Sequence, residues 1–80
     1  MMRIGALTIE VRPEHGQYVA LENVTGMFGE GDSADDALSN LVESLYDHKR
    51  DLEEHRPRLS EHLSTQLRAL ARSLPRREET

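Results

Sequence analysis

Cysteine and tryptophan are both absent from this 80-residue chain. Without cysteine the chain has no disulfide, no thiolate nucleophile and no cysteine-ligated zinc or iron–sulfur site. No apolar run approaches the roughly 20 residues of a membrane span, and residues 1–5 lack the apolar core of a signal peptide. These absences predict a cytoplasmic protein without membrane contact that is stabilised by packing alone.

Sequence motifs for catalysis and for cofactor binding are also missing. There is no G-x-S-x-G nucleophile elbow, and Gly26, Gly29 and Gly31 match neither a phosphate loop nor a dinucleotide fingerprint. We interpret these glycines as strand bends and a turn into a helix. One phenylalanine and two tyrosines are too few for a base-stacking platform. The sequence therefore predicts a non-enzyme without catalytic residues, cofactor or metal.

The charge is divided along the chain. Residues 1–55 hold four basic and twelve acidic side chains, a formal charge of −8, whereas residues 56–80 hold six basic and three acidic ones, a charge of +3. All six basic residues of the second part are arginines, at positions 56, 58, 68, 72, 76 and 77. The arginine side chain suits carboxylate or phosphate recognition, although arginines also simply solubilise an amphipathic helix.

The first third of the chain has the pattern of a small antiparallel sheet. Apolar residues alternate over residues 5–11, a turn is expected over residues 12–16 around Pro13, and residues 18–21 form the returning strand. A short third strand is expected around Met27 and Phe28. Tyr18 and Phe28 are the expected aromatic anchors of this three-stranded sheet.

Two amphipathic helices should follow. Ser33 is placed to cap the first helix, with Asp36 three residues later, and this helix should run to about His55 before Pro57 breaks it. Its apolar face comprises Ala37, Leu38, Leu41, Val42, Leu45 and Leu52. The second helix, from about 58 to 75, carries a narrow leucine seam of Leu59, Leu63, Leu67, Leu70 and Leu74.

The predicted fold class is therefore α+β: a three-stranded antiparallel sheet and a helix, followed by a second, C-terminal amphipathic helix. Residues 1–55 form the β-β-β-α part, and residues 56–80 supply an arginine-rich helix and a frayed tail to the same fold.

Three histidines at intervals of seven residues, His48, His55 and His62, raise the alternative of a metal site. Their carboxylate neighbours are Asp47, Asp51 and Glu54. A histidine pair four residues apart is missing, and Pro57 interrupts the helical register. Solvated surface histidines are therefore the favoured interpretation.

A family resemblance rests on the order of these motifs. The run Gly16-x-Tyr18-Val19-Ala20, followed by Gly26-x-x-x-x-Gly31-Asp32-Ser33-x-x-Asp36-Ala37-Leu38-x-Asn40, resembles the HicB-like antitoxin fold over roughly residues 3–50. Many family members continue into a DNA-binding segment, whereas only one helix and a tail are expected here after residue 56. The resemblance implies a β-β-β-α unit that associates with itself and covers a small ribonuclease toxin.

The leading hypothesis is accordingly an antitoxin-like, non-catalytic protein that binds a toxin and forms a dimer or a larger oligomer. The predicted core and turn residues are Tyr18, Gly26, Phe28, Gly31, Ser33, Leu38, Leu41 and Leu45. The predicted partner or oligomer contacts are Leu63, Leu67, Leu70, Leu74, Arg68 and Arg72, with the acidic body as a competing toxin-binding surface. The alternatives are a self-assembling structural domain and a DNA-binding regulator that uses the arginine-rich helix.

Overall fold

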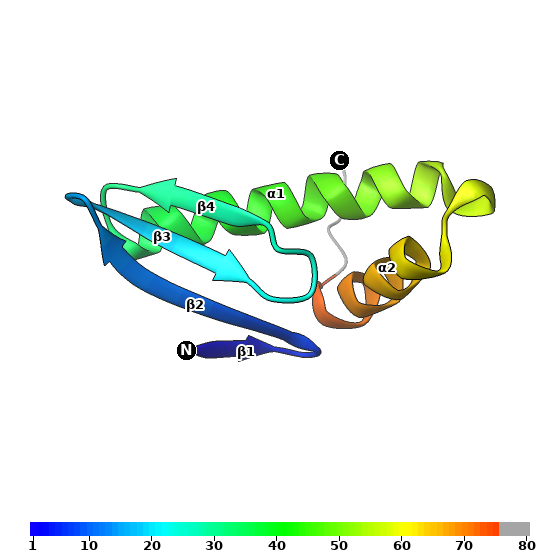
Figure 1. The fold of residues 1–80 in the computed structure, drawn as a ribbon, viewed down its shortest axis with the longest axis horizontal. Coiled ribbons are helices and arrows are strands. Elements are labelled where there is room, and N and C mark those ends of the chain that lie inside the picture. Colours follow the sequence, from blue (N-terminus) through cyan, green and yellow to red (C-terminus); the bar gives the residue numbers. More distant parts are fainter. Residues whose placement is uncertain (76–80) are drawn as a thin grey trace.

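The computed structural model describes residues 1–75 and has an α+β fold (Figure 1). Its elements are β1 (Met2–Ile4), β2 (Leu7–Glu14), β3 (Gln17–Glu22), β4 (Phe28–Gly31), α1 (Ala34–Glu54), a 3₁₀ turn η1 (Arg56–Arg58) and α2 (Glu61–Ser73). The strands form one antiparallel sheet in the order β1-β2-β3-β4. The α+β prediction is confirmed, but the predicted number of three strands is wrong. The additional strand β1 has only three residues, too few for a readable period of two.

The β2–β3 hairpin turns more tightly than its composition predicts. Instead of forming part of a turn over residues 12–16, residues 12–14 continue β2, and Pro13 is paired with Tyr18. The reversal needs only His15 and Gly16, with φ of 51° and 80°. Two consecutive positive φ angles are typical of the two-residue turns that match the strand twist. Pro13 is tolerated because it lies beyond the reach of β1, on a free edge of β2.

Helix α1 lies so close to β4 that two strand residues must be glycine. A Cβ on Gly29 would lie 2.5 Å from the Ala37 carbonyl oxygen, and one on Gly31 would lie 2.6 Å from the Ala37 nitrogen. Real Cβ atoms do not approach other atoms so closely. The role of these two glycines is therefore close packing against a helix, which corrects their interpretation as strand bends. Gly26, with φ of 73°, lies where the chain turns between β3 and β4, and its N–H donates to the Glu22 carbonyl.

The leucine seam of the second helix packs on its own chain. Figure 1 shows α1 running along the sheet and beyond it, with α2 folded back beside the second half of α1. Leu67, Leu70 and Leu74 are buried, in one cluster with Leu7, Ile9, Ala20, Ala37, Leu41, Leu45 and Leu52. Leu63 is half-buried against that cluster.

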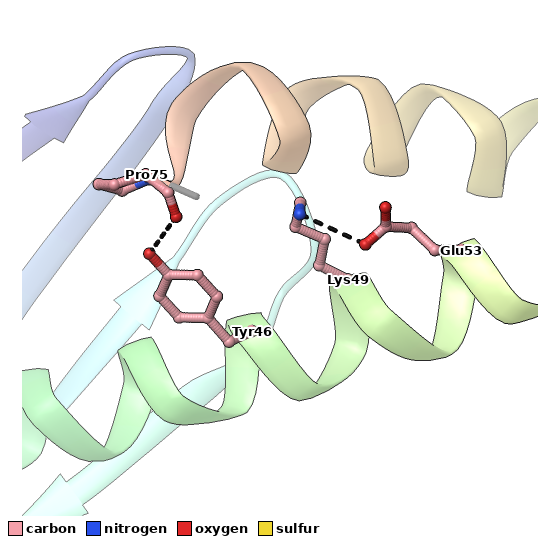
Figure 2. Close-up of polar contacts among 4 residues, drawn as sticks. All are labelled: Tyr46, Lys49, Glu53 and Pro75. Carbon is pink, nitrogen blue, oxygen red and sulfur yellow. Dashed lines mark hydrogen bonds and ion pairs between the residues drawn. The ribbon is translucent and has the colours of Figure 1, made fainter. Parts of the chain in front are cut away.

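Hydrogen bonds join the C-terminal end of α2 to the rest of the fold and cap its N-terminal end. The Ser73 hydroxyl accepts a hydrogen bond of 2.8 Å from the Ala6 N–H, which joins the end of α2 to the β1–β2 turn. The Tyr46 hydroxyl of α1 donates to the Pro75 carbonyl at 2.6 Å, as Figure 2 shows. At the other end, the Ser60 hydroxyl caps α2 by accepting from the Leu63 N–H.

The predicted first helix is confirmed at both ends. The Ser33 hydroxyl accepts from the Asp36 N–H at 3.0 Å, and His55 is the C-cap. Pro57 lies within η1, where its missing N–H and fixed φ end the long helix. Within residues 1–75, neither helix is long and apolar enough to cross a membrane.

Candidate functional site: the uncovered face of the sheet

The two faces of the sheet have different surroundings. Strand register places Ile9 opposite Glu22 and Ala20 opposite Gly29 on the face that packs against α1. The intervening residues point to the other side, because side chains alternate along a strand. This outer face comprises Arg3, Thr8, Glu10, Arg12, Val19, Leu21, Phe28 and Glu30. Among the described residues, no helix packs over it.

The middle of the outer face is apolar. Leu21 is paired with Phe28, and Val19 is two residues from Leu21 on the same strand. We call Val19, Leu21 and Phe28 the apolar strip. Val19 and Leu21 are half-buried, whereas Phe28 is 56% exposed. An exposed aromatic side chain beside aliphatic neighbours is the kind of surface that protein partners cover.

The two sheet aromatics are therefore not core residues, and this part of the sequence prediction is wrong. Phe28 has the outward register, opposite to that of Gly29. Tyr18 has the helix-side register but lies near the β2–β3 turn, and its 36% exposure keeps it outside the core. The other predicted core residues Leu41 and Leu45 are fully buried, and Leu38 is partly buried against them.

Acidic side chains border the apolar strip. Glu10 is the register neighbour of Leu21, and Glu30 is that of Val19. Both are exposed, as are Asp32 and Asp35 just beyond β4. The strip also has one basic neighbour, Arg12, which is the register partner of Val19 on β2. Arg12 pairs with a carboxylate, since its Nε lies 3.6 Å from a Glu14 oxygen. The surroundings of the strip thus favour a cationic partner.

A buried carboxylate fixes the loop that leads into Phe28. Glu22 is fully buried and accepts hydrogen bonds from the Val24 N–H, from the Thr25 N–H at 2.9 Å and from the Thr25 hydroxyl at 2.7 Å. The Thr25 hydroxyl in turn accepts from the Met27 N–H at 3.1 Å. Because every buried side-chain polar atom among the described residues has a partner, this loop has a defined conformation. The position of Phe28 is therefore set before any partner binds.

At the outer edge of β4, some backbone N–H and C=O groups point away from the sheet. The Glu22 N–H donates to the Met27 carbonyl at 2.9 Å, and hydrogen-bonded pairs alternate with other pairs in an antiparallel ladder. The backbone groups of Phe28 and Glu30 consequently point away from β3. The Glu30 carbonyl agrees with this direction, because it accepts from the Asn40 side chain at 2.6 Å.

Two of the three histidines meet through a residue that sequence reasoning missed. His48 Nε2 lies 2.9 Å from the Gln66 Oε1, and Gln66 Nε2 lies 3.2 Å from His62 Nε2. Gln66 is 7% exposed, so the bridge lies in the α1–α2 contact. His55 bonds instead to the Asp51 carbonyl at 2.9 Å. Among residues 1–75, no three histidine or carboxylate side chains gather as metal ligands would.

The predicted contact residues of α2 divide into two groups. Leu67, Leu70 and Leu74 are buried within the chain, which leaves Leu63 as the only half-exposed member of the predicted set. Arg68 and Arg72 are exposed, and Arg68 Nη2 donates to the Thr65 hydroxyl at 3.2 Å. Arg76 and Arg77 lie outside the described residues, as does the tail whose fraying was predicted.

A polar groove runs along the second half of α1. It has a volume of about 480 Å³ and is lined by α1 side chains from Ser44 to Glu54 together with Met27. Its charges are partly paired, since Arg50 Nη2 lies 2.7 Å from Asp47 Oδ1. Lys49 and Glu53, which do not line the groove, form a pair of their own on α1, with Lys49 Nζ 3.3 Å from a Glu53 carboxylate oxygen (Figure 2). No serine in the groove is paired with a histidine base among the described hydrogen bonds, and we assign it no chemistry.

Three comparisons with known proteins give no relative. No family model matches the chain, and the comparisons with curated proteins and with solved structures found no match.

Proposed function

We propose that this chain is a non-catalytic, antitoxin-like protein that binds and neutralises a small basic protein, such as a ribonuclease toxin, through the outer face of its sheet. The observation that carries the proposal is the exposed Phe28 in the uncovered, acid-bordered apolar strip. The toxin-binding part rests on the HicB-like resemblance of residues 3–50.

Burial of the leucine seam moves the expected contact from α2 to the sheet. Leu67, Leu70 and Leu74 already have apolar neighbours within the chain, so a partner gains no buried area from them in this conformation. Phe28, in contrast, loses exposed area only when something covers the outer face. Aromatic side chains at the centre of a contact commonly dominate the binding energy.

The acidic charge of the chain also supports the outer face of the sheet as the binding surface. A ribonuclease that contacts RNA phosphates is expected to be basic, and the first 55 residues carry a formal charge of −8. An apolar centre with an acidic border resembles the general organisation of protein interfaces, in which charged residues lie at the rim.

The test is co-expression of the chain with the product of the adjacent gene, followed by light scattering of the purified material. We expect a complex with the wild type and at least a tenfold loss of affinity with Phe28→Ser, since interface hot spots contribute about 2 kcal/mol or more. Tyr18→Ser is the matched control, because Tyr18 is an exposed aromatic residue of the adjacent strand β3 but has the opposite, helix-side register.

A complex that survives Phe28→Ser but is lost with Arg68→Ala would contradict the proposal and favour α2. A homo-oligomer that dissociates with Phe28→Ser and recruits no second protein would favour the self-assembling alternative instead.

A further inference from the structure

We propose that the outer edge of β4 binds an extended segment of the partner as a fifth strand, and that this segment alternates lysine or arginine with apolar residues. This inference rests on the proposed function and names the part of the partner that the site takes. Strand addition obtains affinity from main-chain hydrogen bonds and specificity from alternate side chains.

The backbone of β4 supplies the hydrogen-bonding groups. Strand alternation directs the N–H and C=O of Phe28 and the N–H of Glu30 toward the edge. Asn40 donates to the Glu30 carbonyl and borders one end of this edge, so the added strand would pair mainly beside Phe28. The edge strand is also held rigidly, because Gly29 and Gly31 lie against the backbone of α1.

The apolar strip determines the side chains that such a segment needs. Residues of the added strand with the outward register would lie beside Phe28 and continue the row that Phe28 forms with Leu21. Apolar side chains at every second position would therefore extend the strip. The exposed fraction of Phe28, 56%, would fall when they cover it.

The charge around this edge selects the remaining side chains and disfavours a second copy of the chain. A Cβ on Gly31 would lie 2.5 Å from the Asp36 Cβ, so Asp36 lies on the helix side of this edge, to which those remaining side chains point. Asp36 is exposed, as are Asp32 and Asp35, and residues 28–40 contain no lysine or arginine. A two-fold pairing of β4 with β4 would bring this acidic set against itself, because such an interface uses the same surface twice. Like charges on neighbouring strands are destabilising, whereas lysine or arginine there would be attracted.

The experiment uses the full chain and a short, blocked, fluorescent peptide in which lysine alternates with valine. Binding is measured by fluorescence anisotropy, and amide hydrogen exchange is followed at Phe28 and Glu30. We expect the peptide to bind, the exchange of both amides to slow, and a peptide with glutamate in place of lysine to bind at least tenfold more weakly.

Two variants at one position separate charge from backbone pairing. Glu30→Gln removes the charge only, whereas Glu30→Pro also removes the edge-facing N–H. Proline at such an edge is compatible with this sheet, as Pro13 shows in β2. Because Glu30 has the outward register whereas the lysines of the added strand point to the helix side, we expect Glu30→Gln to leave peptide binding nearly unchanged and Glu30→Pro to weaken it about tenfold. Exchange data on the wild type stand independently of whether the proline variant folds.

The inference is overturned if the peptide does not bind, if the glutamate peptide binds equally well, or if Glu30→Pro and Glu30→Gln have the same effect. Slower exchange at Phe28 on raising the protein concentration alone would also overturn it, in favour of a second copy. If the adjacent-gene product forms a Phe28-dependent complex while the peptide fails, the proposed function stands and only strand addition is rejected.

Discussion

The two faces of one sheet have opposite surroundings in this chain. On the helix side, Leu7, Ile9 and Ala20 are fully buried beneath α1, and the glycines of β4 let that helix approach closely. On the outer side, Val19, Leu21 and Phe28 are also apolar, but no helix within residues 1–75 packs over them. A small chain can bury only part of its apolar surface, and the side on which it leaves that surface exposed indicates where a partner binds.

The comparison is most strongly tested by removing side-chain volume from each face. We expect Leu7→Ala, on the helix side of the sheet, to lower the free energy of unfolding by about 2–5 kcal/mol, because it leaves a cavity among fully buried neighbours. Urea denaturation monitored by circular dichroism measures this change. Leu21→Ala on the outer face is the matched substitution and should cost about 1 kcal/mol or less. Equal costs would mean that the two faces do not differ as described.

A smaller loss of stability is expected for a substitution at the contact between α1 and β4. Gly29→Ala places a methyl group against the backbone of α1, and we expect a loss of about 1–3 kcal/mol because the helix must move. The same denaturation experiment applies. Glu30→Ala, at the next residue of the strand, points outward and serves as the control. If Gly29→Ala were neutral, the close approach of α1 to β4 would not be needed for stability.

The smallest effect on stability is expected at Phe28, the most exposed residue of the apolar strip. Phe28→Ser should change the free energy of unfolding by less than about 1 kcal/mol, because more than half of the side chain is already in contact with water. Thermal unfolding of the isolated chain measures it. A large loss would show that Phe28 supports the fold, and its effect on partner binding could then not be assigned to contact.

Local signals in the sequence predicted most elements. Ser33 and Asp36 located the start of α1, and Pro57 located its end. Alternation located β2, and the apolar run after the expected turn located β3. The three-residue strand β1 gave no periodic signal, and Pro13 suggested a turn where only His15 and Gly16 turn. Local pattern thus identifies elements better than their boundaries, because boundaries depend on which backbone groups find a partner.

The candidate site depended on tertiary contacts and was largely missed. Helix α1 packs on one face of the sheet, and this packing determines which residues of β3 and β4 stay exposed. The residue pattern of a single strand does not predict which face the helix covers. One signal was available, because residues 18–21 are apolar on both faces of the strand. Such a strand is buried only when elements pack on both of its faces, and the described part of the chain packs a helix on one of them. The Gln66 bridge between His48 and His62 likewise appears only when α1 and α2 meet.

The central claim is that a partner contacts the outer face of the sheet and leaves the leucine seam of α2 untouched. Methyl NMR of the chain, titrated with the product of the adjacent gene, tests it directly. Val19 and Leu21 report on the apolar strip, and the half-buried Leu63 reports on α2. We predict that the methyl signals of Val19 and Leu21 shift on binding while those of Leu63 stay in place. Shifts at Leu63 with unchanged Val19 and Leu21 would contradict the account.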